Sequence, residues 1–557
     1  MTSPQLSSYE DRTLYTTWQI TFDRIQQQNG ASAKLLKLWA YFDKQDLWFG
    51  LLEKAKTTKR DPWFAPLEQA NSTDELIQKV TKDELNFNEA IILLRNFGLV
   101  DLEPSLQQQV GPRGYSLHSC VHSWTMFMLN KEWDESLARL ALTCVGSKVP
   151  SRDEKEWWLL EQRLLQHATR QSIFIVDYKL DVDGLYWALY NLGNLFLNQG
   201  KLAEAEKMYV RALQGKEKAL GPDHKSTFNL VNSLGILYTK QGKLAEAENL
   251  YIRALQGKEK AFGPEHILTL NTVNNLGSLF LMQGKLAEAE NMYIRALQEE
   301  ERALGPDHIS TLGTVQLLGT LYTEQGKLAE AENMYIRALQ GKEKALGPDY
   351  LSTLSIIHNV GKLLIMQGKL AEAENMYNRA LQVNEKALGP DHTLTLNTVN
   401  NLGVLYTKQG KLVEAENMYI RALQRNEKAL GLNDISIFDT VNNLGMLYAM
   451  QDKIAAAEKM YEKALQGYEN LLGLETVSTY LPALDIMFAL GDLFAKTNRK
   501  DKAMIMYNRA LTGYTAAQGP SSGKCRQLAD RLQALQVASA ESKVDDEQAA
   551  EPGAAIP

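Results

Sequence analysis

The amino-acid sequence predicts an all-α fold, a right-handed α-solenoid of eight helix-turn-helix repeats that follows a smaller helical domain. A glycine recurs seven times at steps of 42 residues, and an eighth copy follows after 46 residues: Gly193, Gly235, Gly277, Gly319, Gly361, Gly403, Gly445 and Gly491. A tyrosine follows each of these glycines at one fixed distance, from Tyr209 to Tyr507. Units of fixed length that cannot bury their own apolar face stack into solenoids.

Each repeat is predicted to contain two helices. In the third copy, the first helix places Val273, Leu276 and Phe280 on one stripe, and the turn at Gly284 interrupts the chain. The second helix places its apolar residues at i, i+4, i+7 and i+8: Ala289, Tyr293, Ala296 and Leu297. Gly305 is expected to end this helix as a left-handed cap, and the proline after it prevents continuation.

Composition divides the chain into four predicted parts. Residues 1–180 form a helical domain, since all nine tryptophans lie at or before Trp187. Residues 181–515 form the eight repeats, and residues 516–535 form a closing helix. Residues 536–557 are small, polar and acidic, so we expect a disordered tail that cannot offset its ordering entropy.

Charge and cysteine content narrow the classes of partner. The formal net charge is −7 over 557 residues, which gives no support to nucleic-acid binding. Three widely spaced cysteines do not form a disulfide framework, so a reducing compartment is expected. Neither an apolar run long enough to span a membrane nor a signal-peptide pattern is present, and the chain is predicted to be cytoplasmic without a membrane partner.

The repeat pattern resembles the tetratricopeptide (TPR) family over roughly residues 183–515. The family motif has a small and an aromatic residue in the first helix, and alanine, an aromatic residue and alanine in the second. In the third copy these positions are Gly277, Phe280, Ala289, Tyr293 and Ala296. The 42-residue length and the Gly-Pro-Asp-His connector are similar to the kinesin-light-chain-like subgroup. This resemblance implies a protein-interaction scaffold that binds extended peptide segments or partner domains in its concave groove.

Residues 9–170 resemble the winged-helix segment of fungal NB-ARC/TPR proteins of the NLR type. In that family a Met-His-Asp triplet places its histidine near the phosphates of a nucleotide, and Leu117-His118-Ser119 stands at the matching place. The resemblance implies a winged-helix domain and an alternative function. The chain would be the ligand-sensing C-terminal part of an NLR-type signalling ATPase whose nucleotide-binding domain is absent from it.

No catalytic, cofactor-binding or metal-binding residues are predicted, so we expect neither an enzyme nor a small-molecule substrate. The segment from Gly519 to Cys525 is one residue short of a phosphate-binding loop and follows a helix. His118 and His122 could hold zinc together with Cys120, but an ordinary half-buried loop is the favoured interpretation. The recurring glutamates and lysines could form a charged docking surface, but the favoured interpretation is a solvated helix face with i, i+4 pairs.

The predicted binding surface lies on the first helices, at positions −3, −2, +1, +4 and +5 relative to the repeat glycine. Asparagine amides at −3 and −2 can pair with both groups of a peptide backbone. The alternative is that they bridge neighbouring helices. The predicted residues are Asn191, Asn232, Asn274, Asn275, Asn359, Asn400, Asn401, Asn442 and Asn443.

A second pattern has a period of two repeats. Position +4 alternates between threonine and an apolar residue from Thr239 onward, and position +5 alternates between a charged residue and methionine. Met282, Met366 and Met450 are therefore predicted to contact partner side chains every second repeat, because methionine adapts to irregular apolar surfaces. Core packing is the alternative explanation for part of this alternation.

Overall fold

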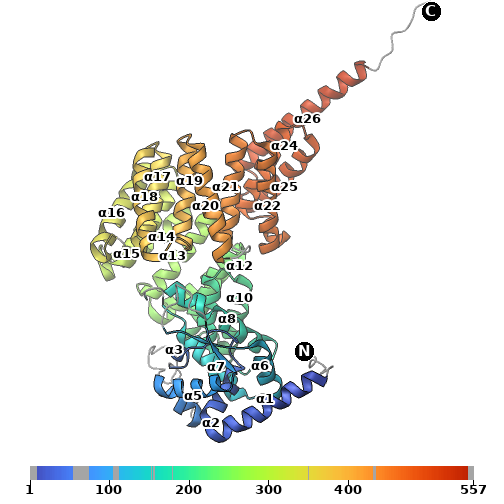
Figure 1. Cartoon of the computed structure of the whole chain (residues 1–557). Coiled ribbons are helices and arrows are strands. Elements are labelled where there is room, and N and C mark those ends of the chain that lie inside the picture. The colour runs from blue at the N-terminus through green and yellow to red at the C-terminus, as the bar shows by residue number, and fades with distance from the viewer. Residues whose placement is uncertain are drawn as a thin grey trace, which may run out of the picture. The chain divides into compact units, whose positions relative to one another are not determined.

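The computed structural model describes residues 9–53, 75–103, 112–151, 154, 157–178, 180–348, 350–430 and 435–549. The chain falls into two compact units, 1–237 and 238–557, which are described separately (Figure 1). The boundary between them lies inside α11 (Lys225–Lys240).

The first unit begins with a mainly helical region. Its elements are α1 (Tyr9–Gln28), α2 (Gly30–Trp39), α3 (Phe49–Glu53), α4 (Glu75–Thr81), α5 (Glu84–Asn96), β1 (Val100–Leu102), β2 (Tyr115–Leu117), α6 (Ser119–Trp124), the π-helix η2 (Thr125–Leu129), α7 (Glu135–Lys148) and α8 (Trp157–Val176). The two strands pair antiparallel, with Val100 opposite Leu117. They form a short hairpin that leads into α6.

The helix pair α7–α8 packs on the first repeat as another repeat would. A Cβ atom added to Gly146 of α7 would lie 2.7 Å from Cβ of Ala188. Glu161 of α8 is buried and accepts hydrogen bonds from Asn198 at 2.7 Å and Gln199 at 3.2 Å. Repeat-like packing therefore begins before residue 181, at which the repeats were predicted to start.

Eight helix pairs follow, as the spacing predicts. They are α9 (Tyr186–Asn198) with α10 (Leu202–Leu220), α11 with α12 (Leu244–Phe262), α13 (Ile267–Met282) with α14 (Leu286–Leu304), α15 (Ile309–Glu324) with α16 (Leu328–Leu346), α17 (Leu351–Met366) with α18 (Leu370–Leu388), α19 (Thr393–Lys408) with α20 (Leu412–Leu430), α21 (Ile435–Met450) with α22 (Ile454–Leu472), and α24 (Leu481–Lys496) with α25 (Lys500–Gln518). The predicted all-α solenoid is confirmed.

The repeat glycine allows the two helices of each pair to approach closely. A Cβ atom added to Gly277 would lie 2.7 Å from Cε1 of Tyr293, and Tyr293 is fully buried. At the end of the second helix, Gly305 has φ 93° and ψ 162°. The cap predicted there as left-handed helical is instead an extended conformation at positive φ, which only glycine adopts readily.

Charged side chains join neighbouring repeats. Glu248 of the second repeat accepts hydrogen bonds from Gln283 at 2.9 Å and Lys285 at 3.2 Å, both in the turn of the third repeat. The same contact recurs at Glu332 and Glu374. The interpretation as i, i+4 pairs within a helix is therefore wrong. The turn lysines reach the adjacent helix because stacked repeats bring the two within one side-chain length.

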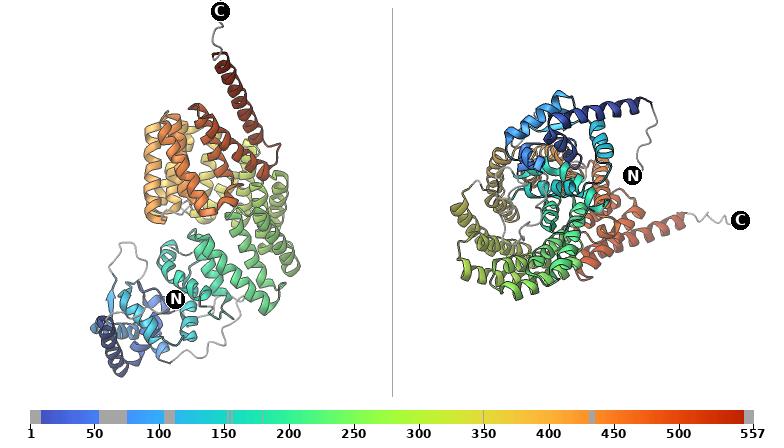
Figure 2. Two further views of the ribbon diagram at one scale, coloured as in Figure 1. Left: turned by 90° about the vertical axis from the view of Figure 1, so that its right-hand side faces the viewer. Right: turned by 90° about the horizontal axis from the view of Figure 1, so that it is seen from below.

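The second unit closes on itself through one further element. The helix α23 (Leu474–Val477) lies in the longer connection that precedes the eighth repeat. The ribbon of this unit curves round as a stack of helices (Figure 2). A Cβ atom added to Gly242, in the turn of the second repeat, would lie 3.0 Å from Cγ2 of Thr476. The corresponding turn glycines Gly284 and Gly326 have no such neighbour within 4 Å. One superhelical turn therefore ends where α23 contacts the second repeat.

The last helix, α26 (Gly523–Ala549), continues beyond residue 536, where a disordered tail was predicted. Its sequence from residue 537 to 549 contains three alanines and two glutamates, which favour helix. Residues 550–557 of the predicted tail lie outside the described residues.

Candidate peptide-binding site

The first helices of the repeats lie closer together than the second helices do. In the second unit, α13 contacts α15, α15 contacts α17, α17 contacts α19, and α19 contacts α21. Within the part of the chain that the structure describes, neighbouring second helices from α12 to α22 do not approach as closely. The stack therefore curves with the first helices on its inner face, which is where a partner segment would meet the predicted residues.

The predicted asparagines are all half-buried on these helices. Position −3 bridges to the first helix of the next repeat in three places: Asn274 Nδ2 donates to Thr314 Oγ1 at 2.7 Å, Gln316 Nε2 donates to Ser355 Oγ at 3.3 Å, and His358 Nε2 lies 2.7 Å from Thr398 Oγ1. At position −3 these contacts match the alternative interpretation, that of bridging between helices.

Three more predicted asparagines bond within the protein. Asn443 donates to Oδ1 of Asn400 at 3.2 Å, and Asn191 donates to the backbone oxygen of Gly146 at 3.1 Å. Peptide binding by the asparagines stays a prediction. The inner face also presents the remaining half-buried members of the set: Asn232, Asn275, Asn359, Asn401 and Asn442.

The predicted methionines are the open part of this surface. Met282 is 45% exposed, Met366 49% and Met450 60%, each in the last turn of a first helix. Met446, which the sequence analysis did not single out, is 49% exposed one turn before Met450. These exposed side chains form the methionine row, in which the charged residues Glu324 and Lys408 stand between the members at +5.

The threonines of position +4 contact the second helix of their own repeat. Thr323 is buried, and its hydroxyl lies 3.4 Å from that of Tyr335 on the second helix. Thr239 and Thr407 make the matching contacts. These contacts match the alternative explanation, core packing, because the tyrosine is long enough to pass the glycine and reach the far edge of the first helix.

A row of buried polar residues on the second helices lies beneath the bridging side chains. Its members in the second unit are Lys258, Glu300, Lys342, Asn384 and Asn426. The sequence analysis missed them because lysine and glutamate were taken as solvated. A usable signal was present, since Glu300 continues the i, i+4, i+7, i+11 stripe of the buried residues Ala289, Tyr293 and Ala296.

Glu300 is the buried anion of this row. Thr314 donates to its Oε2 at 2.6 Å, and the same threonine hydroxyl accepts from Asn274. Oε1 of Glu300 and Oδ1 of Asn274 have no donor within the described structure. Burial raises the pKa of this carboxyl, and the hydrogen bond from Thr314 opposes the rise.

Lys258 and Lys342 occupy the equivalent places in the adjacent repeats. Lys258 donates to the backbone oxygen of Leu268 at 3.1 Å and to Thr272 at 3.0 Å, and burial lowers its pKa to about 8. Lys342 donates to Oε1 of Gln316 at 3.0 Å. The repeats are thus alike in their apolar core and differ in the polar groups at each joint, which is the interface between the second helix of one repeat and the first helix of the next.

The histidines have structural roles where they are described. Nδ1 of His266, His308 and His392 accepts the backbone N–H two residues later and caps a first helix. His118 caps α6 in the same way, and His122 lies 3.0 Å from the backbone oxygen of Phe42. Within the described residues, no group of three His, Cys, Asp or Glu side chains could hold a metal ion. There is also no helix there long and apolar enough to cross a bilayer.

Comparison with known proteins identifies the repeats. The tetratricopeptide repeat model matches in overlapping segments that run from residue 185 to residue 516. The chain belongs to the tetratricopeptide repeat family. A search of curated proteins finds no match.

Three solved structures are similar to this TPR protein. BtubC from P. vanneervenii is 22% identical and covers 41% of this chain and 92% of its own, with a TM-score of 0.35. The nearly identical TPR-like repeats of a protein described as a kinesin light chain from Podosopora anserina are 21% identical and cover 37% and 97%, with a TM-score of 0.32. A signal transduction ATPase with a TPR sensor from Pyrococcus horikoshii is 14% identical and covers 92% and 66%, with a TM-score of 0.42.

Proposed function

We propose that this TPR protein is a non-catalytic scaffold that binds an extended segment of a partner protein along the inner face of its first helices. The single observation that carries the proposal is the exposed methionine row of Met282, Met366, Met446 and Met450. An exposed methionine can adapt its shape to the apolar side chains of a partner. The half-buried asparagines at −2, such as Asn359 and Asn401, would pair with its backbone.

The test compares a binding variant with a bridging variant. After a partner has been identified by pull-down, its affinity is measured for Met282→Ser/Met366→Ser/Met450→Ser and for Asn274→Ala. Burying the exposed half of each methionine contributes about 1 kcal/mol, so the triple variant should lose about 3 kcal/mol, or roughly a hundredfold in affinity. Its melting temperature should stay close to that of the natural protein.

Asn274→Ala serves as the matched control. It removes the bridge to Thr314, so it should lower the melting temperature more than the affinity. Unchanged affinity in the methionine variant would contradict the proposed function.

The assignment of this chain to the kinesin-light-chain-like subgroup, inferred from repeat length, stays a prediction.

The alternative, a sensing part of an NLR-type ATPase, has less support from the contacts. His118, the residue that the resemblance places near a nucleotide, uses Nδ1 to accept the N–H of Cys120 at the start of α6. That ring nitrogen is therefore engaged in capping a helix.

A further inference from the structure

An arginine on the second helix of a repeat pairs with a glutamate on the second helix of the preceding repeat. The arginine stands 18 residues after the repeat glycine, and the glutamate stands 24 residues after the glycine of the preceding repeat. In the described part of the later repeats these pairs include Arg295–Glu259, Arg337–Glu301, Arg379–Glu343, Arg421–Glu385 and Arg509–Glu469.

The first repeat has the arginine without the glutamate. Arg211 stands at the same place on α10, and the helix before it is α8, which ends in Ile175 and Val176. Among the described residues no carboxylate lies within ion-pair distance of Arg211, which is exposed. Glu161 on α8 matches Glu248 on α12, and Ser172 then stands where Glu259 stands, so α8 supplies no carboxylate at this place.

Repeat 1 has a second cation, Lys207, one helical turn before Arg211. Lys207 stands 14 residues after the repeat glycine and is exposed. The five repeats that follow have asparagine there: Asn249, Asn291, Asn333, Asn375 and Asn417. Repeat 1 therefore differs from these repeats in two ways, both of which raise the positive charge beside the end of α8.

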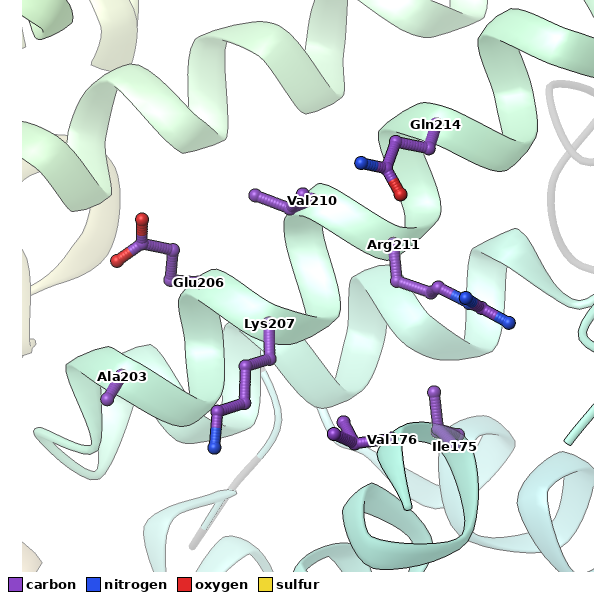
Figure 3. Close-up of a pocket in the computed structure, with 8 residues that line it drawn as sticks. All are labelled: Ile175, Val176, Ala203, Glu206, Lys207, Val210, Arg211 and Gln214. Atoms are coloured by element: carbon purple, nitrogen blue, oxygen red, sulfur yellow. The ribbon is translucent and has the colours of Figure 1, made fainter. Parts of the chain in front are cut away.

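These residues surround an open pocket of about 520 Å³ between α8 and α10. Figure 3 shows Lys207 and Arg211 extending from the side of α10 that faces Ile175 and Val176. The lining is completed by Ala203, Glu206, Val210 and Gln214. Val176 is 44% exposed, so the apolar wall is open to a ligand.

We propose that this pocket binds a partner peptide that presents a carboxylate next to a large apolar side chain. The carboxylate would take the place beside Arg211 that Glu301 takes beside Arg337, with Lys207 adding a second charged contact. The apolar side chain would pack on Ile175 and Val176. A pocket of this size with an apolar floor and a few converging charges is typical of a ligand site.

Charge complementarity selects this partner over a basic one. Two cations and one carboxylate, Glu206, line the pocket, and Glu206 already has another interaction within the protein. An incoming lysine or arginine would meet Lys207 and Arg211 and be repelled. This site is separate from the methionine row on the inner face, so it can be present whether or not the proposed function holds.

The test selects peptides from a random 12-residue library displayed on phage, with the full chain as the target. Selected peptides are then measured by fluorescence anisotropy against the natural chain, the Lys207→Asn/Arg211→Ala variant and the Arg337→Ala variant. We expect peptides with Asp or Glu adjacent to Leu, Ile, Phe or Trp. Their affinity should fall at least tenfold in Lys207→Asn/Arg211→Ala and should weaken as salt is raised.

Arg337→Ala is the matched control, because it removes the equivalent arginine where a glutamate already occupies it. It should leave peptide affinity unchanged. Since Arg211 has no ion pair in the described structure, the double variant should keep the natural melting temperature, which excludes unfolding as the cause of lost binding. A selection without carboxylate-containing peptides, or peptides that bind the double variant equally well, would overturn the proposal. Self-association of the chain that depends on Arg211 would also overturn it, since a second copy would then be the occupant.

Discussion

Replacing Glu300 by glutamine should stabilise the protein at neutral pH. The carboxyl is fully buried, Thr314 donates to one oxygen, and the other oxygen and Oδ1 of Asn274 have no described donor. Glutamine keeps an oxygen that accepts from Thr314 and replaces the other oxygen with an NH₂ donor, while Asn274, which bonds to the same threonine, has an acceptor without a donor. Satisfying one buried acceptor contributes about 1–3 kcal/mol, and the penalty of burying a charge is removed as well.

The pH dependence distinguishes this cause from a general packing effect. Burial raises the pKa of Glu300 in the folded state above its value in the unfolded chain. The stability linked to this group is therefore fully present below the unfolded pKa, about 4.3. It is lost as pH rises through the folded pKa. Glu300→Gln should thus exceed the natural protein in stability at pH 8 and match it more closely at pH 4.5.

Urea unfolding followed by circular dichroism at the two pH values measures this difference. A gain of about 1–3 kcal/mol would raise the midpoint by roughly 0.5–1 M at pH 8. Glu301→Gln is the control, since Glu301 is partly exposed and pairs with Arg337 at 2.6 Å. Loss of that pair should lower stability by at most about 1 kcal/mol. A Glu300→Gln protein that is less stable than the natural chain at pH 8 would refute the reasoning.

Four further outcomes are expected. Gly277→Ala should destabilise by about 1–3 kcal/mol, because the new methyl group meets a buried tyrosine ring. Gly313→Ala should stabilise the protein by about 0.5–1 kcal/mol, because no atom outside its own helix lies within 4 Å of the new methyl group. Thermal melts of both variants measure these changes. In a background without the exposed natural cysteine, the pair Gly242→Cys/Thr476→Cys should form a disulfide under mild oxidation. Gly284→Cys/Thr476→Cys should not form one, and equal cross-linking of both would show that α23 does not close the turn. Isothermal titration of the chain with ATP or ADP should detect no binding at micromolar concentration, and measurable binding would contradict this expectation.

The fold could be predicted because its determinants are local and periodic. A glycine at every step and a tyrosine sixteen residues later predict the close helix pair, and the structure places Tyr293 against Gly277. The ends of the helices follow from Gly284 and Gly305. The closure by α23 could not be predicted in this way. It depends on a small rotation accumulated over many repeats, which no single residue reveals.

The binding surface could be predicted only in part. Alternation at +5 indicated Met282, which is exposed, but the same argument also indicated Thr323, which is buried. Both residues satisfy the same angular rule on one helix. The difference arises because Tyr335 of the second helix reaches around to the hydroxyl of Thr323. Contacts that depend on the length of a side chain on another helix are not visible in the period of one helix.

The buried polar row addresses a difficulty that near-identical repeats create. An apolar core of alanine and tyrosine is the same at every joint, so it would not distinguish one pairing of repeats from another. The polar groups do distinguish them. Lys258 bonds to Thr272, Glu300 to Thr314, and Asn384 to Thr398.

A repeat stacked on the wrong neighbour would leave at least one of these groups buried with an unsuitable partner, which costs about 1–3 kcal/mol or more for a charged group. Unsatisfied pairings of this kind act against incorrect assembly. The unpaired oxygen of Glu300 then has a physical interpretation. A buried polar row whose members differ can specify which repeats pack together, even if one interface loses a little stability. Glu300→Gln should recover that stability and make its interface resemble the one that contains Asn384.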